Sequence, residues 1–191
     1  VSGTVIASSG FSISQSLDVS GALSATAGTS TFTGTSTLNG TANLFNVTIN
    51  GTSLILSASS VLGIANTFTI SAGSLNVSSN KPNTVIFNGT GAQTVNAIIY
   101  HHLTLANGNT KTAAAGITVN GNLTINSSTT FNAGSYTHTL LGNWINNGTF
   151  AAGTSTVQMT GATNTSITGA TTFNILTINK STTSNVVALQ N

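Results

Sequence analysis

The sequence has no cysteine, no arginine and no glutamate, and only four of its 191 residues are charged. The lack of cysteine excludes disulfides and thiol chemistry. Three scattered lysines cannot form the basic stripe that neutralises phosphates, so no nucleic-acid partner is expected. Asp18 is the only acidic residue. A catalytic pair of carboxylates is therefore excluded.

Long runs of helix-forming or apolar residues are also missing. The longest stretch free of Ser, Thr, Asn and Gly is seven residues, Ala97 to Leu103. A globular helix usually needs about 10–14 residues and a membrane-spanning helix about 20, so neither is expected. The chain starts without Met and without the pattern of a signal peptide. Val1 is therefore expected to be a processed end or the edge of a longer chain.

Four small or polar residue types dominate what is present. The chain has 36 Thr, 25 Ser, 24 Asn and 20 Gly. Such a composition is often disordered, but Leu, Ile, Val and Phe still make up 50 of the 191 residues. That fraction lies above the roughly 20% below which disorder is expected. Since Val, Ile and Thr favour strands, the sequence predicts a folded all-β protein.

Internal repeats give the strongest signal. A strand core followed by Asn recurs at Val47–Asn50, Leu123–Asn126 and Leu176–Asn179, with weaker copies at 68–70 and 103–105. In each, apolar residues flank a Thr, which is the pattern of a half-buried strand. Strand centres recur about every 18 residues, which predicts a single-chain parallel β-solenoid of roughly ten coils. The strands should pair in parallel one coil apart, with the apolar flanks buried and the central Thr exposed.

The first 45 residues have a shorter rhythm. Gly28, Gly34 and Gly40 stand six residues apart, and Phe32, Leu38 and Leu44 follow the same period. We expect the glycines at coil corners and the large side chains pointing inward. The alternative for 1–45 is a shaft of several intertwined chains. In the favoured interpretation, 1–191 is one continuous array, with shorter repeats in 1–45 and longer ones in 46–191.

Segments 28–50 and 156–180 resemble the Thr/Asn/Gly-rich repeats of bacterial surface and secreted fibre proteins, including β-solenoid adhesins of the haemagglutinin and autotransporter type. The resemblance implies an extracellular, structural or adhesive role, and it carries over no functional residues. Stacked coils also explain why charge is scarce, because like charges about 4.8 Å apart would repel through every layer.

Neither end of the sequence has a polar cap. Val1–Ile6 is strand-like and Val186–Leu189 is apolar. Because open strand edges recruit other chains, we expect further coils of the same chain or end-to-end self-association into a filament.

Few residues could carry chemistry, and no catalytic, cofactor or metal site is expected. His101 and His102 are adjacent on an expected strand, so their side chains should point to opposite faces and not share a metal ion. His138 is isolated, and Asp18 is several coils from any histidine, too far for a catalytic triad. Trp144 could be a surface platform for sugars, but a buried filler of the coil is favoured.

Two surface patterns leave a binding role open as the alternative function. Nine Thr-x-Thr pairs suggest a Thr/Asn face that binds carbohydrate or ice, although about seven are expected by chance and they do not recur once per coil. Ten Asn-x-Ser/Thr sequons, close to the number that composition predicts, make glycans a possible partner. The sequons begin at Asn39, Asn46, Asn50, Asn76, Asn88, Asn122, Asn126, Asn147, Asn164 and Asn179.

Overall fold

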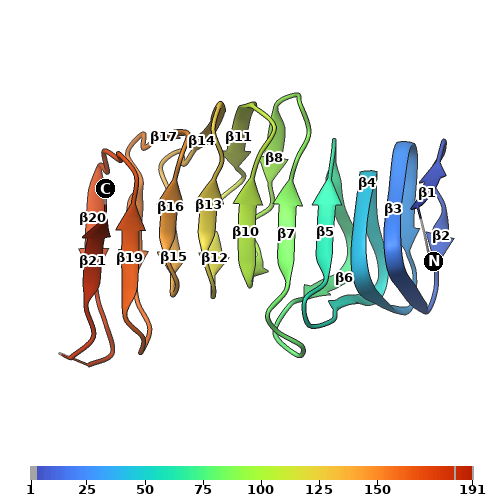
Figure 1. Cartoon of the computed structure of the whole chain (residues 1–191), viewed down its shortest axis with the longest axis horizontal. Helices are drawn as coiled ribbons and strands as arrows, with labels where there is room; N and C mark the ends of the chain where they lie inside the picture. The colour runs from blue at the N-terminus through green and yellow to red at the C-terminus, as the bar shows by residue number, and fades with distance from the viewer. Residues whose placement is uncertain (1–3, 183, 191) are drawn as a thin grey trace. The chain divides into compact units, whose positions relative to one another are not determined.

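The computed structural model describes residues 4–182 and 184–190, and this part of the chain is built from strands without a helix (Figure 1). Val1 lies outside the described residues. The strands are β1 (Thr4–Ala7), β2 (Ser12–Ile13), β3 (Ser16–Phe32), β4 (Thr35–Leu56), β5 (Val61–Ile64), β6 (Phe68–Asn76), β7 (Thr84–Phe87), β8 (Gln93–Val95), β9 (Ile99–Tyr100), β10 (His102–Leu105), β11 (Asn109–Ala113), β12 (Thr118–Val119), β13 (Leu123–Ile125), β14 (Thr129–Asn132), β15 (Thr137–Leu140), β16 (Trp144–Asn146), β17 (Thr149–Ala151), β18 (Thr156–Met159), β19 (Thr165–Thr168), β20 (Ile175–Ile178) and β21 (Val187–Gln190).

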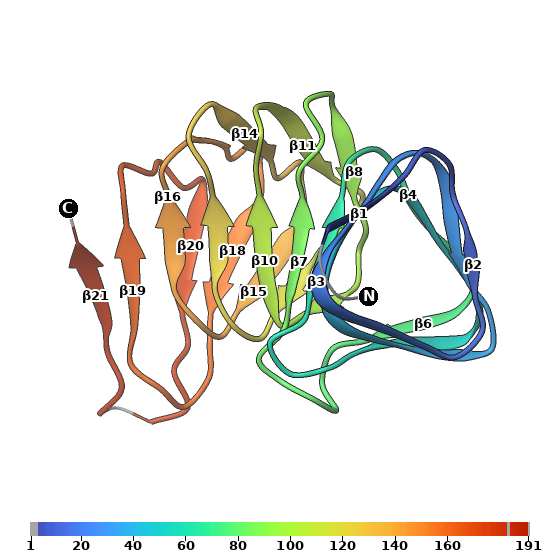
Figure 2. The same ribbon diagram turned by 45° about the vertical axis from the view of Figure 1, so that its right-hand side comes forward.

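The chain divides into two compact units, 1–88 and 89–191. In the first unit, β1, β3, β4, β5 and β7 form a parallel series, with β2 beside β3 and β6 beside β4. Strands β3 and β4 are long because they continue around the corners of the coil, as Figure 2 shows nearly end-on. Residues 16–56 thus coil upon themselves within one chain, as the solenoid prediction for this region requires.

The second unit has three parallel sheets, one on each face of the coil. Their orders are β10-β13-β16-β19-β21, β8-β11-β14-β17 and β9-β12-β15-β18-β20. Leu103 lies beside Leu123, and Leu123 beside Trp144, so one coil takes 20 or 21 residues here. The described chain makes about nine turns, which confirms the predicted parallel β-solenoid and comes close to its predicted coil count.

The repeated strand cores behave largely as predicted. The apolar flanks of 47–49, 103–105 and 123–125 are buried, and the central Thr of each is partly exposed. Leu176–Ile178 does pair in parallel, with β18, but Ile178 is 54% exposed. The predicted burial is wrong at this strand because β20 is the edge of its sheet, and within the described residues no further strand pairs with it.

Glycines turn the chain at the predicted corners of the first unit. Gly28, Gly34 and Gly40 have φ of 72°, 63° and 94°, a left-handed region that side chains other than glycine rarely adopt. The side chains that share their period point inward, and Phe32, Leu38 and Leu44 are at most 1% exposed.

The core of each unit is a stack of apolar side chains, one layer per coil. In the second unit the largest members form an aromatic cluster, in which the Trp144 ring centroid lies 4.7 Å from that of Phe150 and 5.1 Å from that of Phe173. Trp144 is buried, whereas Phe173 is only partly buried. Phe68 and Phe87 are buried in the core of the first unit.

Candidate functional site: polar ladders on the coil surface

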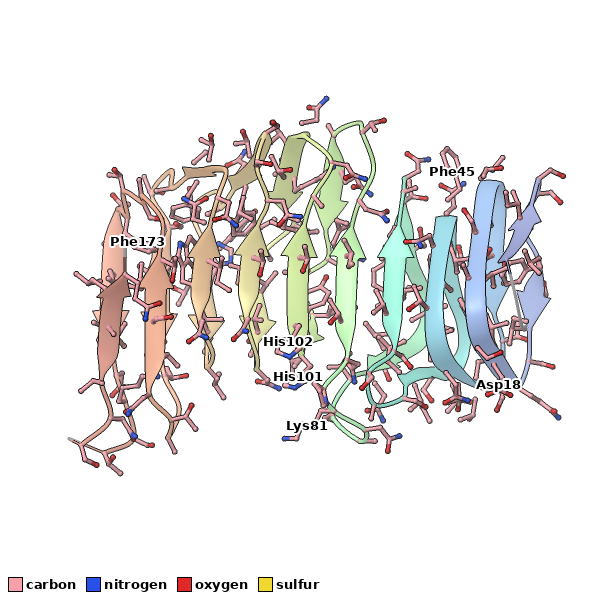
Figure 3. All side chains as sticks on the ribbon, in the orientation of Figure 1. Asp18, Phe45, Lys81, His101, His102 and Phe173 are labelled. Atoms are coloured by element: carbon pink, nitrogen blue, oxygen red, sulfur yellow. The ribbon has the colours of Figure 1, made fainter. Side chains whose placement is uncertain are left out.

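The two adjacent histidines lie together, contrary to the prediction that they point to opposite faces (Figure 3). Their rings stack with centroids 4.4 Å apart and an interplanar angle of 23°. The prediction failed because only His102 belongs to β10, while His101 lies in the bend before it, where strand alternation does not apply.

His102 is the first member of a ladder of side-chain acceptors. The Asn122 backbone N–H donates to His102 Nδ1 at 2.9 Å, and the Asn143 N–H donates to Asn122 Oδ1 at 3.0 Å. The Ser166 N–H then donates to Asn143 Oδ1 at 2.9 Å. In each case a side chain of one coil accepts a hydrogen bond from a backbone N–H at or near the start of the next coil's strand.

This hydrogen bond fixes the chemistry of His102. Because Nδ1 accepts a hydrogen bond, the neutral ring carries its proton on Nε2. Burial lowers the pKa of His102, which favours the neutral form of the ring. Within residues 4–182 and 184–190, no three His, Asp or Glu side chains gather in a way that could hold a metal ion.

His138 is a buried structural residue. Its Nδ1 accepts the Ile117 N–H at 3.3 Å, and its Nε2 lies 2.9 Å from the Ala133 carbonyl oxygen. Its ring meets that of Phe131 edge-on, with centroids 5.6 Å apart. Burial lowers the pKa of His138, and the hydrogen bond to Ala133 opposes this effect in part.

The lone acidic residue belongs to a second ladder, in the first unit. The Asn39 amide donates to an Asp18 carboxylate oxygen, and the Ser57 hydroxyl donates to the Asn39 amide oxygen. The Asn46 amide likewise donates to the Gly28 carbonyl oxygen at 3.1 Å. The Nδ2 atoms of the Asn39 and Asn46 sequons are therefore occupied within the fold.

Trp144 is not a surface platform. Its side chain is 1% exposed, and its indole N–H donates to Thr171 Oγ1 at 3.1 Å. The favoured prediction of a buried coil filler is confirmed. Tyr136, 39% exposed, is the large exposed aromatic side chain of the described chain.

Lys111 is a buried residue that the sequence reasoning missed. Its side chain is fully buried, and Nζ donates to the carbonyl oxygens of Gly89 at 2.5 Å and Gly91 at 2.9 Å. Burial lowers the pKa of this amine. The sequence does contain a signal for this burial, because Lys111 lies between Thr110 and Thr112. If both threonines point outward from the strand, alternation makes the lysine between them point inward.

The sheet that contains Lys111 carries a two-rank array of small polar side chains on its outer face. Backbone register aligns Thr110 with Thr130 and Thr130 with Thr149. A second rank, two residues further along each strand, consists of Thr94, Thr112, Asn132 and Ala151. We call these seven residues the Thr array. It is a surface on which repeated contacts can be made.

The described part of the chain has no helix that could cross a membrane. Comparison of the sequence and structure with family models, with curated proteins and with solved structures gave no match.

Proposed function

We propose that the chain is a non-catalytic structural segment of an extracellular bacterial fibre, filament or adhesin stalk. The observation that carries this proposal is the uninterrupted parallel pairing of successive coils within each unit, around one apolar core. Every coil of about 20 residues advances the stack by about 4.8 Å. A longer chain of such coils therefore forms a longer rigid rod.

The composition of the surface supports a non-catalytic, structural role. Outward side chains are mostly Thr, Ser and Asn, which stack without the repulsion that charged side chains would cause. The two side-chain ladders, through Asn122 and through Asn39, add side-chain hydrogen bonds between successive coils. The extracellular and bacterial parts of the proposal rest on the resemblance to repeats of surface proteins.

The proposal includes self-association end to end. Edge strands expose large apolar side chains: Ile6 on β1 is 69% exposed and Leu189 on β21 is 80% exposed. Beside β21 lies a cleft of about 340 Å³ lined by Ile167, Phe173, Leu176 and Leu189. An added strand from a second copy would pair with the free edge and cover this apolar surface.

Electron microscopy of native source material tests this function. Filaments that bind an antibody against the chain are expected, and isolated small particles would refute the proposal. For self-association, Leu189→Lys should lower the mass measured by light scattering, because it places a charge on the exposed edge. The control Tyr136→Lys changes a side chain away from that edge and should leave the mass unchanged.

A binding module is the second candidate, and the Thr array favours it. The nine Thr-x-Thr pairs do not recur once per coil in the sequence, but the structure aligns one of them, Thr110 with Thr112, with polar residues of adjacent coils. A Thr/Asn face that binds carbohydrate or ice would add a function to the stalk.

A further inference from the structure

The hydroxyl groups of the Thr array are available to water. Among the described residues, the side chains of Thr94, Thr110, Thr112, Thr130 and Thr149 have no hydrogen-bond partner within the protein. Each hydroxyl offers one donor and two acceptor sites. Five such groups on one face can therefore bond to water molecules simultaneously.

Backbone pairing fixes the spacing of these hydroxyls. Strands β11, β14 and β17 pair without a register shift across this region. Neighbouring threonines in one rank are therefore about 4.8 Å apart, and the two ranks are about 6.6 Å apart along the strands. A rectangular repeat of this size is comparable with the spacing of oxygen atoms on faces of crystalline ice.

The layer beneath the array holds it rigid. The inward residues of the same strands are Lys111, Phe131 and Phe150, stacked in register. Lys111 is tied to the carbonyl oxygens of Gly89 and Gly91, and the rings of Phe131 and Phe150 are 5.8 Å apart. A rigid support matters because a flexible array would have to be ordered whenever it bound a lattice.

Other faces lack this combination. On the β9-β12-β15-β18-β20 face, the outward rank through Thr118 and Thr139 also contains Ile99 and Gln158. On the β10-β13-β16-β19 face, Ile145 interrupts the rank of threonines.

The first unit has a free rank through Thr31 and Thr48, but two of the threonine hydroxyls beside it are already used. Thr33 Oγ1 donates to the Ile13 carbonyl oxygen at 3.3 Å, and Thr67 Oγ1 donates to Asn46 Oδ1 at 2.8 Å. On the face of β8, β11, β14 and β17, by contrast, each of two neighbouring ranks contains at least two threonine hydroxyls without a partner in the protein.

We infer that the Thr array is an ice-binding face, which holds water molecules at the repeat of the ice lattice and thereby adsorbs to ice. One hydroxyl–water bond adds little over bulk water, but several bonds made together on a rigid face add up. The array has no charged side chain to hold water in its own hydration shell, because Lys111 points inward. This inference rests on the binding-module candidate and is independent of the fibre role.

Carbohydrate is the less favoured ligand for this face. Sugar sites commonly combine an aromatic platform with fixed polar groups. The ranks of the array contain no aromatic side chain. A repeated lattice of small hydroxyls matches a repeated lattice of water better than it matches a single sugar ring.

Ice growth in the presence of the purified 191-residue chain tests the inference. Nanolitre osmometry should show faceted crystals and thermal hysteresis, and labelled protein should enter slowly growing ice. Thr130→Tyr, at the centre of the array, should abolish crystal shaping because the larger ring prevents close approach. Thr149→Tyr, in the same rank, should weaken it.

The matched control is Thr139→Tyr, a half-buried outward threonine in the middle of the β9-β12-β15-β18-β20 face. Its ice activity should equal that of the unmodified chain, with circular dichroism confirming that all variants fold. Absence of ice shaping by the unmodified chain, full activity of both array variants, or equal loss in the control would each overturn the ice-binding face. Binding to insoluble cellulose or chitin that Thr130→Tyr abolishes, without ice shaping, would also overturn it while retaining a binding role.

Discussion

Gly63 in β5 offers the sharpest test of how the coils are joined. It lies in register with Asn43 of β4, and a Cβ at this position would sit 2.1 Å from Asn43 Oδ1 and 2.8 Å from Asn88 Nδ2. The Asn88 amide donates to Asn43 Oδ1 at 3.0 Å across the space that the missing side chain leaves. The glycine therefore permits a hydrogen bond that passes over an intervening coil.

Gly63→Ala should break this hydrogen bond. Its loss costs about 1 kcal/mol, and the strain of placing a Cβ against the Asn43 side chain adds about 1 kcal/mol or more, which gives at least about 2 kcal/mol in total. For a chain of this length, each kcal/mol lowers the melting temperature by about 2–4 °C. Differential scanning calorimetry should therefore show Gly63→Ala melting about 4–8 °C below the unmodified protein.

A second comparison separates the clash with Asn43 from the general effect of adding a methyl group at position 63. In the background of Asn43→Ala the closest clashing atom is absent, so adding Gly63→Ala should change the melting temperature by only about 1 or 2 °C. Equal effects of Gly63→Ala in both backgrounds would refute the bridging role of Asn43 and Asn88.

Three further predictions concern the second unit. Phe131→Ala should lower the free energy of unfolding by about 3–5 kcal/mol, because Phe131 is fully buried. Phe173→Ala should lower it by less, because Phe173 is only partly buried. A larger loss for Phe173→Ala in calorimetry would contradict this dependence on burial. Lys111→Met keeps much of the side-chain volume but removes the donor to Gly89 and Gly91, so it should cost about 1–3 kcal/mol, and an unchanged melting temperature would show that these bonds add nothing. Burial lowers the pKa values of His102 and His138, so the unfolded chain binds more protons just below pH 6.5 and stability should fall as the pH drops from 6.5 toward the folded-state pKa values. His138→Gln should flatten this decline in a series of thermal melts, whereas an unchanged pH profile would exclude His138 as a cause.

Much of the fold was contained in the sequence. Alternation of apolar residues around Thr48, Thr104 and Thr124 identified half-buried strands, and their spacing of about 18 residues required coils that stack in parallel. Gly28, Gly34 and Gly40 marked corners because glycine adopts positive φ without steric cost. These properties depend on local conformation and on periodicity, which one chain displays directly.

Side-chain partnerships were decided only by the tertiary structure. Coil lengths vary, so a sequence offset does not reveal that Asn122 follows His102 in a ladder or that Thr130 aligns with Thr149. The stacking of His101 on His102 depends on a bend whose position alternation cannot predict. Strand alternation indicates that Lys111 points inward, but its partners, carbonyl groups one coil away, follow only from the tertiary structure. Periodicity thus determines that coils stack, whereas the register between coils determines which polar atoms meet.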